Sequence, residues 1–183
     1  MPSDRELYLA HLLNIFGEED EIHEVDAADG GEPIQIFVYK DIPEEGMITG
    51  VTYGLSLVAH PDWTASRPEM IVSVESTHIE WATAAAAFVA EFRGTKAFRF
   101  GDLFTTDVPL APDTKMSGFL VFAQSILDDD YGTVQLSDYP VHFSEFYPIY
   151  PEEVAVYERI GFEAFWDHDN FDMYAIARQP VQD

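Results

Sequence analysis

Cysteine is absent from this chain of 183 residues. A disulfide framework, a thiol nucleophile and a thiolate zinc site are therefore excluded. Long apolar runs are missing as well, because no stretch reaches the roughly 18 uncharged apolar residues of a membrane-spanning helix. The first residues, Met1 to Glu6, contain no basic region that leads into an apolar run. No signal peptide is therefore expected, and the predicted compartment is the cytoplasm.

Basic residues are scarce in this sequence. Nine lysines and arginines stand against 34 aspartates and glutamates, which gives a net charge of −25. A field of this sign repels nucleic-acid phosphates and anionic lipids, and it attracts cationic partners. Direct binding to nucleic acid or to a membrane is therefore not expected. Three explanations of the acidity stay open: a charge-complementary protein partner, a salt-rich cytoplasm, or simply an acidic soluble protein.

The motifs of common catalytic and nucleotide-binding sites are missing too. The chain has no Gly-x-Gly-x-x-Gly, Walker loop, Gly-x-Ser-x-Gly or His-Glu-x-x-His. The run Asp128–Asp130 lacks the spacing of an EF-hand loop, so a solvated turn is predicted, and whether it binds a cation stays open. The mixed histidine and aspartate runs at 60–62 and 167–169 are contiguous, and adjacent side chains rarely reach one ion. No metal and no cofactor are expected.

Residue types suited to hydrolysis are present, although no motif connects them. A hydrolase built from His60, Asp62, His142 and Glu145 is the alternative that residue type alone allows. It requires that the fold bring these side chains together in one concave pocket. Trp63 lies in the same loop as His60 and is either a contact residue for a partner or a side chain that folds back on the core.

Apolar residues are abundant, at 47% of the chain with 14% aromatic. This composition supplies a core, and we predict one domain over residues 1–183. A helix is predicted over residues 3–16, because Ser3 and Glu6 form a capping box and an apolar stripe follows. Residues 51–100 hold five acids and four bases, so this nearly neutral part is predicted to form the centre of the fold.

Helical and strand patterns alternate along the rest of the chain. A helix over 77–93 is predicted to begin with a capping box at Thr77 and to place Arg93 in its last turn. Another helix is predicted from Pro151 to about residue 160, and either a turn or a further helix at 162–166. A loop is predicted at 18–32. The predicted strands are 34–39, 47–58 with a bend at Gly54, 69–75, 118–123, 133–136, 141–150 and 174–178.

Several short segments, taken in order, resemble the suppressor-of-fused family over residues 34–178. Each segment alone is weak, but their order and spacing together are specific. The chain resembles the small bacterial single-domain members, because it has no room for the additional C-terminal domain of the animal signalling protein. The segments are Thr52-Tyr53-Gly54-Leu55-Ser56, Arg67-Pro68-Glu69-Met70-Ile71-Val72, residues 86–91, Gly101-Asp102, Phe119-Leu120-Val121-Phe122, and Phe146-Tyr147-Pro148-Ile149-Tyr150-Pro151-Glu152-Glu153 with Gly161 eight residues later.

The resemblance implies an α/β (α+β) fold in which a mixed, largely antiparallel central sheet is flanked by helices in a single domain. It implies a binding module without known catalytic apparatus. Bacterial members resemble immunity proteins that neutralise polymorphic toxins, many of which are basic nucleases. The first hypothesis is therefore a non-catalytic immunity protein that docks on a cationic toxin domain by charge steering.

Contact residues for that partner are predicted in the family segments and in the loop at residues 60–63. They are Tyr53, Gly54, Leu55, Ser56, His60, Asp62, Trp63, Tyr147, Tyr150, Glu152 and Glu153. Besides the hydrolase, a further alternative is nucleic-acid mimicry, in which rows of carboxylates copy the spacing of phosphates. The sequence names neither the partner nor the oligomeric state.

Overall fold

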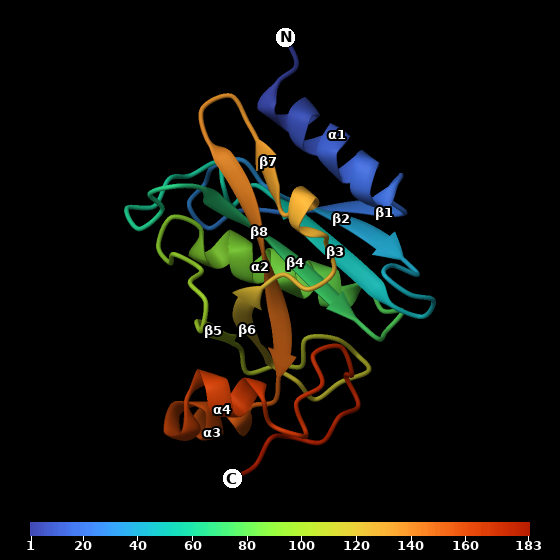
Figure 1. The fold of residues 1–183 in the computed structure, drawn as a ribbon, viewed down its shortest axis with the longest axis vertical. Helices are drawn as coiled ribbons and strands as arrows, with labels where there is room; N and C mark the ends of the chain where they lie inside the picture. Colours follow the sequence, from blue (N-terminus) through green and yellow to red (C-terminus); the bar gives the residue numbers. More distant parts are fainter.

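A sheet of eight strands forms the centre of the computed structural model, which describes residues 1–183 (Figure 1). Helices pack against the sheet, and the two termini lie at opposite ends of the long axis of the molecule. The elements in chain order are α1 (Asp4–Phe16), β1 (Glu21–Val25), β2 (Ile34–Lys40), β3 (Ile48–Tyr53), β4 (Arg67–Val74), α2 (Glu80–Phe92), β5 (Leu103–Thr105), β6 (Gly118–Ala123), the 3-10 turn η1 (Asp129–Tyr131), β7 (Thr133–Gln135), β8 (Pro140–Ile149), α3 (Glu153–Ile160) and α4 (Phe162–Trp166).

The strand order is β1-β2-β3-β4-β8-β6-β5, and β7 pairs with β8 beside this path. Only β4 and β8 run parallel, and every other pair is antiparallel. Parallel neighbours need a long crossover connection, and here that connection contains α2. The mixed, largely antiparallel sheet with flanking helices is therefore confirmed. The nearly neutral part of the chain supplies half of β3 and all of β4 and α2, and β4 lies in the middle of the strand order.

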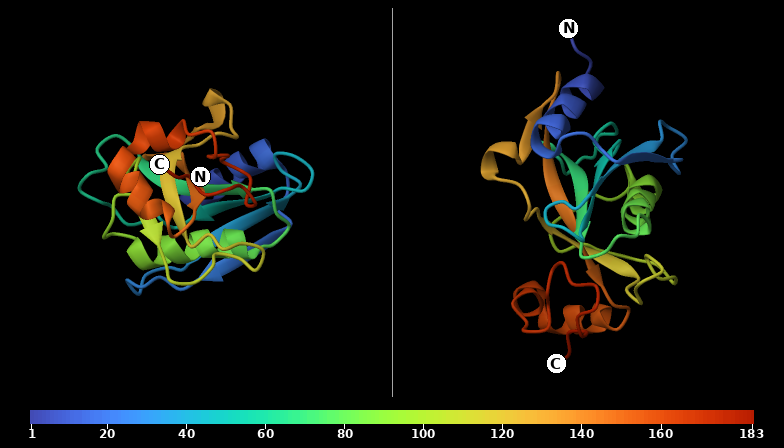
Figure 2. Two further views of the ribbon diagram at one scale, coloured as in Figure 1. Left: turned by 90° about the horizontal axis from the view of Figure 1, so that it is seen from below. Right: turned by 90° about the vertical axis from the view of Figure 1, so that its right-hand side faces the viewer.

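The two faces of the sheet are covered by different helices. In the side view of Figure 2, α2 lies on one face and α1 lies on the other. On the α2 face, Trp81 is fully buried in the largest core cluster. On the α1 face, Tyr8 is fully buried and its hydroxyl donates to the carbonyl of Thr52 at 2.6 Å. A third cluster joins α3 and α4 to the far end of β8.

A small residue on β3 lets α2 approach the sheet closely. A Cβ atom at Gly50 would lie 2.8 Å from the Cβ atom of Ala82 on α2. Because real Cβ atoms do not come this close, only glycine fits at this position of the strand. The close approach buries Ala82, Ala85 and Ala86 against the sheet and leaves the opposite side of the helix, with Ala87, toward solvent.

Two of the predicted boundaries near the N-terminus are wrong. The predicted loop at 18–32 contains β1, an edge strand in register from Glu21 opposite Val38 to Val25 opposite Ile34. Its acidic residues hid the pattern, because one face of this strand is exposed and tolerates charge. The predicted strand at 47–58 ends at Tyr53. Gly54 takes a φ of 136°, so the predicted bend occurs there but the strand does not continue beyond it.

The predicted helix beginning at Thr77 starts three residues later. Ile79 is the N-cap of α2, and no side chain caps the helix, so the predicted capping box is wrong. Instead the hydroxyl of Ser76 accepts from the backbone of His78 at 3.1 Å and donates to Asp113 at 2.5 Å. These two bonds fix residues 76–78, which precede α2 and are not helical.

Two predictions about the C-terminal third are also wrong. The helix predicted from Pro151 begins at Glu153, since the two preceding residues form a turn. The strand predicted at 174–178 is not formed. The backbone of Glu75 donates one hydrogen bond to the carbonyl of Tyr174 at 2.9 Å, and this single bond does not make a strand pair. None of the helices has the length and apolar character needed to cross a bilayer.

Candidate functional site

The first family segment, residues 52–56, wraps around the buried carboxylate of Glu69. The backbone nitrogens of Gly54 and Ser56 donate to this carboxylate at 2.9 and 3.0 Å. The hydroxyls of Thr52 and Ser56 each donate to it at 2.7 Å. The turn after β3 is possible because Gly54 has a positive φ, and a Cβ atom there would lie 2.9 Å from a side-chain carbon of Ile34. The segment therefore forms a nest for an internal carboxylate.

No cation touches the carboxylate of Glu69 directly. Burial raises its pKa, and the hydrogen bonds from the segment oppose that shift. Two arginines hold the nest from outside: Arg67 donates to the carbonyl of Ser56 at 2.9 Å, and Arg93 donates to the carbonyl of Gly54 at 3.1 Å. Arg93 was predicted to serve the end of α2, but it is buried and paired with Asp29 at 2.6 Å. That ion pair lowers the pKa of Asp29 to about 2.

The second family segment, residues 146–153, fixes the C-terminal end of the chain. The carboxylate of Glu153 is fully buried and forms an ion pair with Arg178, whose second nitrogen donates to it at 2.8 Å. The backbone nitrogens of Tyr150 and Val181 also donate to this carboxylate, each at 2.7 Å. One side chain therefore connects the end of β8 to the last residues of the chain.

A third buried carboxylate, Glu145, lies on β8 between these two networks. It accepts from the backbone and hydroxyl of Ser125 at 2.7 and 2.8 Å and from the hydroxyl of Tyr147 at 3.0 Å. Its other oxygen, Oε1, has no hydrogen-bond partner. Burial raises the pKa of Glu145 to about 7.

The residues of the hydrolase alternative do not converge. His60 and Asp62 line a hollow together with Lys96 and Arg99, and neither His142 nor Glu145 reaches it. His142 and Glu145 are three positions apart on β8, so their side chains point to opposite faces of the sheet. His142 instead shares a hydrogen bond of 2.7 Å with the hydroxyl of Ser66. The structure thus gives this alternative no common pocket. It also contains no cluster of three or more histidine and carboxylate side chains that could hold a metal ion.

The loop residues lie close to one another on the surface. His60 and Asp62 line the same hollow, whose volume is about 350 Å³, and Asp62 is ion-paired with Arg99. The ring of Trp63 is half-buried against the core, and its nitrogen donates to the carbonyl of Ala97 at 2.7 Å. One part of the indole therefore packs on the core, and another part stays accessible.

The predicted contact residues divide into an inner and an outer set. The inner set has buried side chains or backbone, which the structure assigns to the interior and not to a docking surface: Tyr53, Gly54, Leu55, Ser56, Tyr147 and Glu153. The outer set is exposed or half-buried and consists of His60, Asp62, Trp63, Tyr150 and Glu152. Only the outer set remains available to a partner in this conformation.

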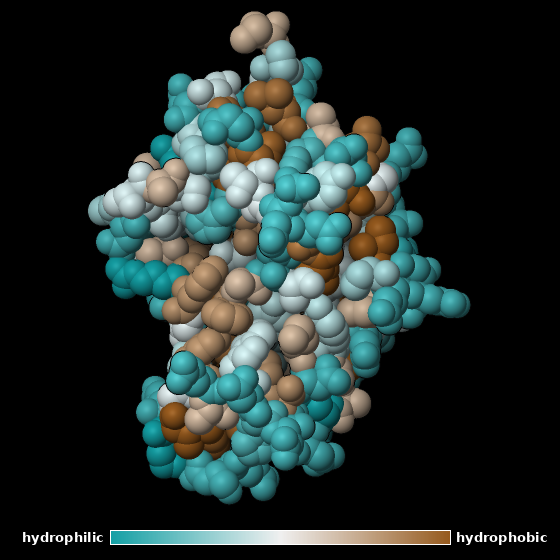
Figure 3. Space-filling model, viewed as in Figure 1, coloured by the Kyte–Doolittle hydropathy of each residue, from teal (hydrophilic) through white to brown (hydrophobic).

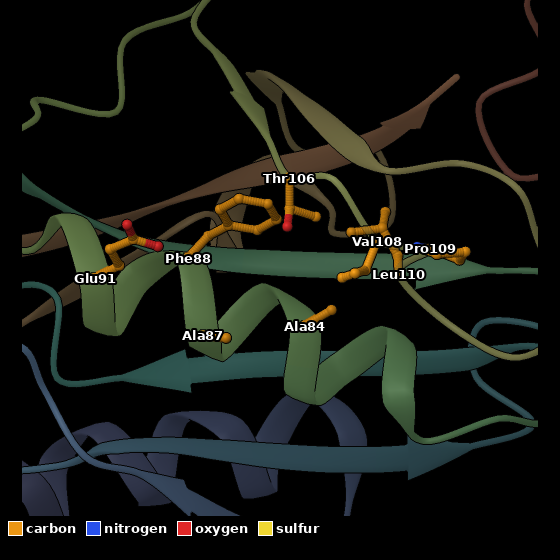
Figure 4. A pocket seen from close by; sticks show the side chains of 8 residues that line it. All are labelled: Ala84, Ala87, Phe88, Glu91, Thr106, Val108, Pro109 and Leu110. Carbon is orange, nitrogen blue, oxygen red and sulfur yellow. The ribbon is translucent and has the colours of Figure 1, made fainter. Parts of the chain in front are cut away.

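A groove that the sequence did not suggest runs beside α2. A hollow of about 220 Å³ lies between this helix and the loop at residues 106–110. In Figure 4 the labelled side chains of α2 face the labelled side chains of that loop. The lining residues are Ala84, Ala87, Phe88, Glu91, Thr106, Val108, Pro109 and Leu110. Two features of the sequence point to this hollow, the alanine run at 84–87 and the apolar residue Val108. They do not predict it, because the run alone does not show which alanines face away from the sheet.

The distribution of hydropathy on one face is shown in Figure 3. Hydrophilic residues are spread over most of this face, residues of intermediate hydropathy occupy its middle, and strongly apolar residues appear at separate places in the upper half and near the lower left end. One exposed apolar residue of the molecule, Phe100, is 56% exposed and packs edge-on against Phe122 with ring centroids 5.3 Å apart. The surface is therefore acidic with local apolar areas.

Solved structures with the same fold include a suppressor of fused homolog from Neisseria gonorrhoeae. It superposes with a TM-score of 0.72 at 16% identity, and the match covers 97% of this chain and 96% of that one. A Sufu–Fu complex matches with a TM-score of 0.66 at 15% identity over 97% of this chain and 91% of that one. Drosophila Suppressor of Fused matches with a TM-score of 0.65 at 16% identity, and this chain covers 51% of its length. Identities this low establish the fold alone.

No curated protein matches this chain. The sequence profile described as suppressor of fused protein (SUFU) matches residues 30–179, which include both segments that surround the buried carboxylates of Glu69 and Glu153. The resemblance seen in the sequence and the fold of the sheet agree with this match. The chain belongs to the suppressor of fused family.

Proposed function

We propose that this chain is a non-catalytic protein-binding module, and specifically an immunity protein that neutralises a cationic toxin domain in the cytoplasm. The observation that carries the proposal is that most basic side chains are paired within the chain, whereas most acidic side chains are not. Five of the nine bases form ion pairs within the chain: Lys40, Arg93, Arg99, Arg159 and Arg178. Most of the 34 carboxylates have no such partner, and most of those lie at the surface, so the surface carries a large excess of negative charge.

The family supports a binding role. One solved structure with this fold is a complex, the Sufu–Fu complex, and the family resemblance described in the sequence analysis implies an immunity role for small bacterial members. Both points concern other proteins, and they favour a protein partner here. The sequence offers no catalytic motif, and the hydrolase candidates do not share a pocket. A cationic toxin is the partner that the charge favours, because opposite fields accelerate the encounter and suppress wrong partners.

The mechanism that follows is docking of a preformed surface. The acidic field would draw the toxin domain in, and the outer contact residues, His60, Asp62, Trp63, Tyr150 and Glu152, would meet it. A bound toxin is neutralised when the complex covers the surface that it needs for its own substrate. If that substrate is nucleic acid, the same basic residues that bind phosphates are the ones attracted to these carboxylates.

The test is co-expression with the toxin encoded beside the gene of this chain. We expect the chain to rescue growth and to form a complex that weakens as salt is raised, because exposed charges are screened within about 10 Å at 0.1 M salt. Failure to rescue, together with no complex at low salt, would remove the proposal. A complex that forms but ignores salt would show that the contact is apolar and that the acidity has another origin.

A further inference from the structure

The groove beside α2 has a second hollow at its other end. This hollow has a volume of about 380 Å³ and shares Pro109 and Leu110 with the first. The two hollows therefore adjoin at the loop that follows β5, and together they are called the groove. Among the residues that line it, the only charged ones are Glu91 at one end and Glu80 at the other. No basic residue of the chain lines the groove.

The middle of the groove is apolar and open to solvent. Its floor includes the ring of Phe88, which is held by edge-on contacts with Phe104 and Phe119 at centroid distances of 6.1 and 5.8 Å. On the loop side, Val108 is 61% exposed. Exposed apolar surface within a hollow favours binding of an apolar side chain, because such burial is worth more than contacts at a rim.

The spacing of the two carboxylates fits an extended segment. Glu80 and Glu91 are separated by 11 positions along α2, which corresponds to about 16 Å along the helix axis. An extended chain rises roughly 3.3 Å per residue and points successive side chains to opposite sides, so two side chains on one side, six positions apart, lie about 20 Å from each other. Flexible lysine or arginine side chains adapt this spacing to the roughly 16 Å between the carboxylates. A segment lying along the groove could therefore place one basic residue at each end and an apolar side chain between them.

We propose that this groove binds an extended segment of a cationic partner, with an apolar side chain in the hollow beside Phe88 and a lysine or arginine facing each of Glu80 and Glu91. The inference rests on the proposed function and adds the segment chemistry that the partner must offer. The carboxylates select a cationic segment over an anionic one, and the hollow selects an apolar side chain over a polar one. The carboxylates alone, or the hollow alone, would not select a segment that is both cationic and apolar at its middle.

The probe is the synthetic peptide acetyl-Lys-Ser-Leu-Ser-Ser-Ser-Lys-amide, titrated into isotope-labelled full-length protein and followed by amide chemical shifts. Its lysines are six positions apart and its leucine is two positions from the first lysine, so all three side chains lie on one side of the extended peptide. We expect shifts at Ala84, Ala87, Glu91 and Val108 that saturate together. A peptide with serine in place of leucine, and one with glutamate in place of both lysines, should each bind at least about tenfold more weakly, because burial of the leucine and the paired charges are both needed.

Two pairs of variants separate the groove from the general field. Ala87→Phe fills the hollow, whereas Ala155→Phe adds the same side chain at an exposed position of α3. Glu91→Lys and Glu158→Lys change the net charge equally, but only the first lies in the groove. We expect Ala87→Phe to weaken the peptide at least about tenfold and Glu91→Lys up to about fivefold more than its control. Unchanged amide spectra away from the mutated site show that each variant is folded.

The outcomes also distinguish this inference from the proposed function. Chemical-shift changes spread over the acidic surface, or an equal loss of peptide affinity in both variants of a pair, would contradict binding in the groove. If the toxin complex forms and Ala87→Phe leaves its affinity unchanged, the partner does not bind in the groove, and the immunity role stands. If the leucine peptide binds in the groove but no neighbouring toxin is neutralised, the groove stands and the immunity role is wrong.

Discussion

Glu153 and Glu152 are neighbours in sequence with opposite environments. Glu153 is fully buried and paired with Arg178, whereas Glu152 is exposed. Replacing Glu153 by glutamine leaves the guanidinium of Arg178 buried without its counter-charge. We expect Glu153→Gln to lower the free energy of unfolding by about 3–5 kcal/mol, measured by urea denaturation. The matched variant Glu152→Gln should change it by less than about 0.5 kcal/mol. Equal effects of the two variants would contradict the assigned role.

Glu145 gives a prediction about pH. Its pKa is raised to about 7 by burial, whereas the unfolded chain ionises this group near its ordinary value of about 4.3. A raised pKa in the folded state contributes stability that is present below the unfolded value and is lost as pH rises toward 7. Glu145→Gln imitates the protonated carboxyl, so it should escape this loss. The variant should gain up to roughly 3 kcal/mol relative to the wild type between pH 4.5 and 7.5.

The measurement is urea denaturation of both proteins over that pH range. Glu163→Gln, at an exposed position of α4, is the control and should keep a constant difference from the wild type. The unpartnered oxygen Oε1 of Glu145 is the atom that can carry the proton without breaking a hydrogen bond. Parallel stability curves for the wild type and Glu145→Gln would show that this carboxyl does not titrate in the folded protein near neutral pH.

At the scale of the element, the turn after β3 depends on a glycine. Gly54 has a positive φ, and a Cβ atom would meet Ile34 at 2.9 Å and the carbonyl oxygen of Pro33 at 3.4 Å. Gly46 also has a positive φ, but a Cβ atom there would have no neighbour within 4 Å. We expect Gly54→Ala to destabilise by about 3 kcal/mol and Gly46→Ala by about 1 kcal/mol, measured by thermal unfolding. Similar losses would show that steric contact at Gly54 is unimportant.

Elements with a clear apolar pattern were predictable, and elements that depend on distant partners were not. The strands at 34–39 and 118–123 were predicted within one residue, because apolar residues dominate both segments. The edge strand β1 was missed because an exposed face carries glutamates as a loop does. The strand expected at 174–178 failed since no neighbouring strand is available to pair with it.

The same limit applies to the candidate site. The segments at 52–56 and 146–153 were identified correctly as distinctive, but their use could not be derived from local sequence. Glu153 is buried because it meets Arg178, which lies 25 positions away. Glu69 is buried because the nest 13 positions before it closes around its carboxylate. Which carboxylates are inside is therefore decided by pairings that only the fold creates.

At the scale of the whole molecule, the charge and the fold have separate roles. The few bases are largely consumed by internal ion pairs, two of which, Arg93 with Asp29 and Arg178 with Glu153, connect distant parts of the chain. Apart from the buried Glu69 and Glu145, most of the remaining carboxylates lie at the surface, where they contribute little to stability but create a long-range field. The groove beside α2 adds local shape to that field. In the proposed mechanism, the acidic field attracts the partner over a long range, and the groove beside α2 holds one of its segments after contact.

The measurement that tests the proposed immunity role most directly is the association rate constant with a toxin domain, sought among the genes that neighbour the gene of this chain, followed by stopped-flow fluorescence at increasing ionic strength. A surface that works by charge steering predicts a rate that falls by about tenfold or more between roughly 0.05 and 0.5 M salt, while dissociation changes much less. An association rate that stays constant over this range would contradict the account.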